Sequence, residues 1–292
     1  MRARPIQQSG FTLIEMIVVI VITGIIGGMV AMFIRAPVQG YVDSANRAEM
    51  GDIADTALRR LARDIRTSVP NSVRMPGTSC VAVGATPCYV EFIPTKQGGR
   101  YRAGTGGNNN ILNFGSGGTF TFDIVGSAMP APAIVAGTDF IVIGSTQSNA
   151  APPYDQTGTG ILRRVTAMTI ADTTITFAAP VLPVWAEVQG QRFDVVDGTQ
   201  RAVTYGCSGA SVNASGNGTG TLTRYWNYNF NTPQVLPPAG GSTAILADNL
   251  SACEITYDLT SQRNGLLTIR LGITRGGESI SLYHAIHINN VP

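Results

Sequence analysis

The sequence predicts an α+β protein in which one long N-terminal helix carries a large antiparallel, β-rich globular head. Residues 11–34 form an apolar run, and apolar residues continue at helical spacing from residue 35 to about residue 69. From residue 75 onward, short strand-like runs alternate with turns rich in glycine and proline. We therefore expect a membrane-spanning half of the helix at residues 11–34, an amphipathic half at residues 35–69 and a head at residues 70–292.

The composition is that of a folded chain with little charge. Only 13% of the 292 residues are charged, whereas 44% are hydrophobic and need burial in a core or a membrane. There are 20 basic and 18 acidic residues, and Arg2 and Arg4 account for the excess. The rest of the chain is neutral, and nucleic-acid affinity comes largely from neutralised phosphates. We therefore expect no nucleic-acid partner.

The apolar run near the N-terminus is long enough to cross a membrane. A helix over residues 11–34 spans about 36 Å, and the hydrocarbon core of a bilayer is roughly 30 Å thick. Arg2 and Arg4 precede the run, so the positive-inside rule keeps the N-terminus in the cytoplasm and exports the remainder. A cleaved secretory signal is disfavoured, because the run is too long and no A-x-A-like cleavage site follows it.

Glu15 is the only charged residue inside this run. A carboxylate in the apolar zone of a bilayer costs about 2.5–3.5 kcal/mol on insertion scales, unless it finds a partner. Cleavage after Gly10 would supply one, because the new α-amino group of Phe11 would lie four residues before Glu15. Glu15 also disfavours the interpretation of the run as an ordinary membrane anchor.

The segment Ser9-Gly10-Phe11-Thr12-Leu13-Ile14-Glu15 resembles the class III signal of type IV prepilins and type II secretion pseudopilins. The resemblance implies that residues 1–10 are a leader peptide, which prepilin peptidase removes by cutting after Gly10. It also implies N-methylation of Phe11 by the same enzyme. Glu15 would then pair with the terminal amine of Phe11 in a neighbouring pilin during assembly.

A narrower resemblance involves residues 33–43, 47–49, 57–66 and 284–292, which are similar to a minor pilin of the mannose-sensitive haemagglutinin (MSHA) type IV pilus. It implies a subunit that is held in the bacterial inner membrane with its head in the periplasm. The subunit would then enter a pilus at the cell surface and help to prime its assembly through contacts with major and minor pilins. Two alternatives remain open: a minor pseudopilin of a type II secretion system, and a pilus-tip adhesin with an aromatic platform at Tyr225–Tyr228.

The second part of the predicted helix is amphipathic. Asp55 and Arg59 form an i,i+4 pair in the favourable orientation. Pro70 disfavours helix in the residue before it, so we expect the helix to end near Ser68. The apolar stripe that should face the head consists of Val38, Val42, Ala45, Ala54, Leu58, Leu61 and Ile65.

The region after residue 75 predicts one large antiparallel β head. A division into two sheets is a second possibility, with residues 144–160 as the boundary and the segment Ala150-Ala151-Pro152-Pro153 as a linker. The strand-like runs occur at residues 89–93, 120–125, 140–143, 161–170, 174–177, 192–196, 222–226, 255–257, 266–273 and 280–288.

The four cysteines, Cys80, Cys88, Cys207 and Cys253, indicate two structural disulfides in an oxidising compartment. Four thiols allow three pairings. Cys80 with Cys88 would close a short loop, and Cys207 with Cys253 would tie a loop to the strand region before Tyr257. A zinc site is disfavoured because the short C-x₂₋₄-C spacing of closed zinc sites does not occur.

The sequence gives little support for catalysis, a metal or a cofactor. His284 and His287 are three residues apart in a strand-like run, which predicts side chains on opposite faces of a sheet. Asp194 and Asp197 lack the alternating oxygen-ligand spacing of an EF-hand. Phosphate-binding loops, zinc-protease motifs and nucleophile elbows do not occur in the sequence. We therefore expect a non-enzymatic protein without a cofactor.

Overall fold

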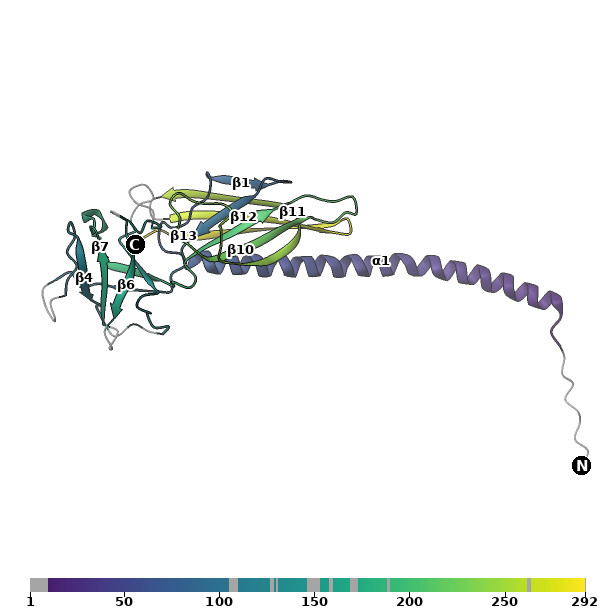
Figure 1. Ribbon diagram of the computed structural model, residues 1–292. Helices are drawn as coiled ribbons and strands as arrows, with labels where there is room; N and C mark the ends of the chain where they lie inside the picture. The colour runs from purple at the N-terminus through teal and green to yellow at the C-terminus, as the bar shows by residue number, and fades with distance from the viewer. Residues whose placement is uncertain are drawn as a thin grey trace, which may run out of the picture. The chain divides into compact units, whose positions relative to one another are not determined.

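The structure, a computed structural model, describes residues 10–104, 110–126, 129, 131–145, 153–157, 160–168, 173–187, 190–261 and 264–291. Over these residues the chain forms one long α-helix, a short 3₁₀ turn η1 (Val184–Ala186) and thirteen strands (Figure 1). The chain divides into two compact units, residues 1–49 and residues 50–292. The predicted α+β class, with one N-terminal apolar helix and a large antiparallel β head, is confirmed.

Helix α1 (Leu13–Arg66) is slightly shorter than the predicted 11–68. It ends before Ser68 because Val69 has already turned toward the sheet, where its N–H donates to the Ile93 carbonyl at 2.8 Å. Within the first unit, every apolar side chain from Leu13 to Ile34 is exposed, as expected for a segment whose natural surroundings are not water. The helix is long and apolar enough to cross a membrane.

The last turns of α1 belong to the second unit and supply one side of its core. Ala54, Leu58, Leu61 and Ile65 are buried, as the helical spacing predicted. The earlier part of the predicted stripe is different, because Val38 and Val42 in the first unit are exposed. The Asp55–Arg59 pair also forms, with 2.6 Å between Arg59 Nε and Asp55 Oδ2.

The first sheet is antiparallel, with the order β13-β12-β11-β10-β9-β2, and β1 pairs with β11. One face of this sheet and helix residues 50–65 together bury the larger hydrophobic core, which includes Met50, Leu61, Phe92 and Ile269. The strands of the first sheet are β1 (Ser79–Ala82), β2 (Cys88–Phe92), β9 (Ala202–Ser208), β10 (Gly220–Tyr228), β11 (Ser242–Ser261), β12 (Asn264–Arg275) and β13 (Glu278–Asn289).

The second sheet has the order β3-β8-β5-β6-β7-β4 and a core of its own, centred on Phe122, Phe177 and Phe193. All of its strands lie between β2 and β9 in the chain, so it is an insertion into the first sheet. These strands are β3 (Gln97–Arg100), β4 (Gly118–Asp123), β5 (Phe140–Ile143), β6 (Leu162–Met168), β7 (Thr174–Ala179) and β8 (Arg192–Val196).

The prediction of a boundary at residues 144–160 was wrong. That segment connects β5 to β6 inside the second sheet, and Ala150, Ala151 and Pro152 lie outside the described residues. The boundaries fall after β2 and before β9, which are neighbouring antiparallel strands with Cys88 opposite Cys207. The inserted residues therefore leave and re-enter the first sheet at adjacent strands.

Strands β1, β3 and β9 were not predicted, and β11 is far longer than the predicted 255–257. Strand β3 reads Gln-Gly-Gly-Arg, and glycine disfavours strands, so this strand depends on its pairing with β8. Strand β11 changes partner along its length: its first half pairs with β10 and its second half with β12 and β1. The distant pairings, β3 with β8 and β1 with β11, leave little local signal.

The cysteines form two disulfides, Cys80–Cys88 and Cys207–Cys253. The first bridges the connection between β1 and β2. The second joins β9 to β11, which are separated by β10 in the sheet. On β2 and β9 the cysteines lie at one end of the strand pair, and the second sheet departs from the other end, where Phe92 is opposite Val203.

Candidate functional site

The first turn of α1 is closed by a reciprocal contact between Thr12 and Glu15. The backbone N–H and the hydroxyl of Thr12 both donate to Glu15 Oε2, each at 3.1 Å, and the Glu15 N–H donates to Thr12 Oγ1 at 3.3 Å. This is a capping box: the side chains of the N-cap and N3 residues accept hydrogen bonds from each other's backbone N–H groups, which have no partner within the helix. Its signature in the sequence is the T-x-x-E pattern of Thr12 and Glu15 before an apolar run, a signal that was missed.

The capping box fixes the position of the Glu15 carboxylate. The carboxylate lies at the N-terminal end of the helix, where the first backbone N–H groups have no partner within the helix. Both donors from Thr12 go to Oε2, and Oε1 accepts no hydrogen bond from the residues that the structure describes. The carboxylate therefore retains one oxygen that can accept a cation or a second donor.

The residues just before the helix are open to their surroundings. Gly10 and Phe11 lie outside the helix and are exposed, and the Phe11 side chain is 81% exposed. The rest of the predicted leader, including Arg2 and Arg4, lies outside the described residues. The Gly10–Phe11 peptide bond is therefore exposed and outside the helix, as preferred sites of proteolytic cleavage are.

The comparisons with known proteins bear on this same segment. Residues 6–32 match the prokaryotic N-terminal methylation motif. The chain carries a type IV pilin-like prepilin signal. This signal marks structural subunits that prepilin peptidase processes, and the match covers only the N-terminal region. No curated protein sequence and no solved structure matches the chain.

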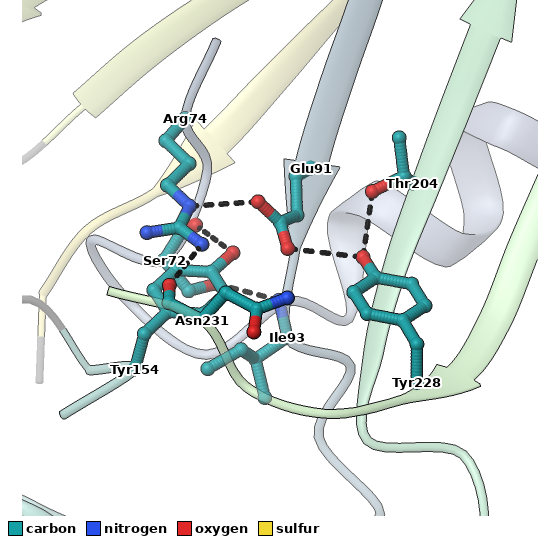
Figure 2. A network of polar contacts seen from close by, with 8 residues as sticks. All are labelled: Ser72, Arg74, Glu91, Ile93, Tyr154, Thr204, Tyr228 and Asn231. Carbon is teal, nitrogen blue, oxygen red and sulfur yellow. Dashed lines mark hydrogen bonds and ion pairs between the residues drawn. The ribbon is translucent and has the colours of Figure 1, made fainter. Parts of the chain in front are cut away.

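A buried polar cluster in the head is the second feature that the sequence analysis did not identify (Figure 2). Glu91 on β2 is 1% exposed, and its Oε2 accepts a hydrogen bond from Arg74 Nε at 2.8 Å. Its Oε1 accepts from the Tyr228 hydroxyl at 3.0 Å, and that hydroxyl also contacts Thr204 Oγ1 at 2.6 Å. The only local signal was an acidic residue in the otherwise apolar strand Cys88–Phe92.

The same cluster extends to the inserted part of the chain. Arg74 lies over the Tyr154 ring at 3.5 Å from its centroid, and its Nη2 donates to the Asn231 carbonyl at 2.8 Å. Tyr154 comes from the connection between β5 and β6, and its hydroxyl donates to the Ser72 carbonyl at 2.7 Å. The cluster therefore ties the second sheet to the first, as the sticks in Figure 2 show.

The electrostatics of this cluster favour a structural role. Burial raises the pKa of Tyr154 and of Tyr228, and the nearby Glu91 carboxylate raises each pKa further. Both phenols therefore stay protonated near neutral pH and serve as fixed hydrogen-bond donors. A buried carboxylate that is paired with an arginine and a phenol is satisfied on both oxygens.

Two further ion pairs hold the elements of the head together. Lys96 Nζ lies 2.7 Å from Asp139 Oδ2, and the Asp139 carboxylate also accepts from the N–H groups of Val135 and Gly198. Asp64 on α1 accepts from the Tyr205 hydroxyl at 2.7 Å and from Arg224 Nε at 3.0 Å. The contacts of Asp64 attach the end of the helix to β9 and β10.

The other candidate residues from the sequence do not converge on one place. His284 and His287 fall on opposite faces of β13. Tyr225 and Trp226 are both half-buried neighbours on β10 and pack against different hydrophobic clusters, so they do not form one flat aromatic face. Within the described residues, no group of three or more His, Cys, Asp or Glu side chains could hold a metal ion.

Proposed function

We propose that this protein is a minor pilin, a structural subunit that is processed after Gly10, anchored by the first half of α1 and inserted into an extracellular filament. The observation that carries the proposal is the combination of the methylation motif with the Thr12–Glu15 capping box directly behind the cleavage point. The proposed route leads from the bacterial inner membrane, with the head in the periplasm, to a pilus at the cell surface.

The proposed docking step uses the Glu15 oxygen that the capping box leaves open. Removal of residues 1–10 would expose the amine of Phe11, and Oε1 of Glu15 on one subunit can accept that amine from another. Because Oε2 stays bound to Thr12, the helix start need not unravel when the pair forms. An amine–carboxylate pair also removes two desolvated charges from the apolar interior.

Within this class, the proposal favours an MSHA-type pilus and the minor pilin known as MshO. The support is the resemblance at residues 33–43, 47–49, 57–66 and 284–292, which also implies the role of helping to prime assembly. A minor pseudopilin of a type II secretion system is the second candidate, since the methylation motif is common to both classes.

Incorporation into filaments tests the proposed docking role of Glu15. We expect Glu15→Val to insert into the membrane normally but to fall at least about tenfold in the sheared pilus fraction, because the buried amine then lacks its partner. Asp52→Asn, which removes an exposed carboxylate further along α1, serves as the control and should be incorporated normally. Equal incorporation of wild type and Glu15→Val at native expression would contradict the proposal.

A further inference from the structure

Strand β13 forms an unprotected edge of the first sheet. It pairs with β12 on one side along its whole length, from Arg275 opposite Glu278 to Asn264 opposite Asn289, without a register shift. Among the described strands none pairs with its other side. Exposed edges usually carry a bulge, a proline, a lysine or an inward-pointing charge, and β13 between Ser279 and Asn289 has none of these.

The hairpin geometry identifies the backbone groups on this edge. Gly276 and Gly277 both have positive φ and form a two-residue turn, so Arg275 and Glu278 are a hydrogen-bonded pair. Antiparallel ladders alternate, so every second residue of β13 directs its N–H and C=O away from β12. These residues are Ser279, Ser281, Tyr283, Ala285, His287 and Asn289.

The side chains beside this edge set the charge that a neighbouring strand would meet. His284, on the core side of β13, and α1 together line a cleft of about 540 Å³, whose helical wall includes Asp55, Arg59, Arg63 and Arg66. Asp55 is already paired with Arg59, and neither Arg63 nor Arg66 forms an ion pair with another described residue. The Nε2 atom of His284 is buried and has no hydrogen-bond partner among the described residues.

We propose that β13 accepts an additional β-strand from another protein, and that this strand carries carboxylate side chains on the side that faces α1. Backbone groups of the edge would supply the hydrogen bonds, as in β-strand addition to other open sheets. Every second side chain of the added strand would lie over the cleft, where the arginine guanidinium groups favour Asp or Glu.

The arginines beside the edge also disfavour pairing of β13 with the β13 strand of a second copy of this chain. Antiparallel pairing of two β13 strands would place two copies of the cleft next to each other, and Arg63 and Arg66 of each copy would repel those of the other. The inference concerns the head alone and does not depend on the proposed pilin role.

Peptide binding to the full chain in detergent tests the proposal. The probes are fluorescein-labelled peptides of about eight residues that alternate threonine with glutamate or, in the matched control, threonine with lysine. We expect the glutamate peptide to bind about tenfold more tightly by fluorescence anisotropy, and Arg63→Glu to remove that preference. Amide hydrogen exchange should show new protection at Ser281, Tyr283 and Ala285 when the glutamate peptide is bound.

A variant of the edge separates strand addition from simple charge attraction. Ala285→Pro removes one outward N–H and should abolish binding, whereas Ala285→Thr should retain it. The proposal is overturned if the two peptides bind equally, or if Ala285→Pro binds the glutamate peptide as well as wild type does without new amide protection on β13. A dimer of the full chain that Ala285→Pro dissociates would also overturn it, in favour of self-pairing.

Discussion

At the scale of single residues, the chain places carboxylates in very different surroundings. Glu15 caps its own helix and keeps one oxygen open, whereas Glu91 is buried with both oxygens bound. Asp194 on β8 is largely enclosed, next to Arg192 and a cavity of about 330 Å³. Burial raises the pKa of Asp194 to about 6, against the attraction of Arg192, which lowers it. The ionised form of Asp194 is therefore disfavoured in the folded head.

The raised pKa of Asp194 predicts a pH-dependent stability. Because this pKa is about 6 in the folded state and near 4 when unfolded, Asp194 destabilises the fold as pH rises through that interval. We expect Asp194→Asn to raise the free energy of unfolding by about 1–2 kcal/mol at pH 8 and to change little at pH 4. Denaturant titrations at the two pH values measure this difference, and an equal effect at both would contradict the assignment.

At the scale of elements, contacts between distant segments hold the head together. The cluster around Glu91 joins β2, β10, the segment that follows α1 and the connection between β5 and β6 (Figure 2). Asp64 attaches α1 to β9 and β10. Each contact is buried or half-buried, so the loss of one partner leaves a charge without compensation.

Removal of Arg74 should therefore cost far more than removal of a surface arginine. We expect Arg74→Met to lower the free energy of unfolding by about 3 kcal/mol, because the Glu91 carboxylate stays buried without its cation. Arg59→Met is the matched control, since Arg59 is 74% exposed and its pair with Asp55 is worth about 0.5 kcal/mol at most. Similar losses for the two variants would show that the Glu91 cluster is not a buried ion pair.

The two disulfides should differ in their contribution to stability. Cys207–Cys253 closes a longer loop than Cys80–Cys88, with sequence separations of 46 and 8 residues. The loop-closure relation gives about 4 kcal/mol for the longer loop and about 2.5 kcal/mol for the shorter one. Thermal unfolding of the paired Cys→Ser variants compares them, and the opposite order would mean that strain or residual structure outweighs chain entropy.

At the scale of the whole molecule, the chain combines an apolar helical unit with a head of two sheets (Figure 1). The second sheet is inserted between neighbouring strands of the first, so the first sheet retains its own core with the end of α1. The insertion accounts for the size of the head. The first unit carries the prepilin-type signal, and the match to the methylation motif ends within that unit.

Local patterns were sufficient to predict the helix and the β class of the head. The apolar run, Glu15 and the spacing of Ala54, Leu58, Leu61 and Ile65 are all short-range signals that depend on no distant contact. The insertion of the second sheet was not predictable, because it depends on β2 pairing with β9 across more than a hundred residues. The Glu91 cluster was hidden for the same reason, since its members are scattered along the chain.

Mass analysis of the N-terminus is the most direct test of the central proposal, that prepilin peptidase matures this chain into a subunit with an N-terminal Phe11. The membrane form from cells that contain the peptidase should begin at Phe11 and carry one added methyl group, and cells without the peptidase should retain residues 1–10. A protein from normal cells that still begins at Met1, or that begins beyond residue 30, would contradict the proposed maturation and, with it, the pairing of Glu15 with a neighbour's amine.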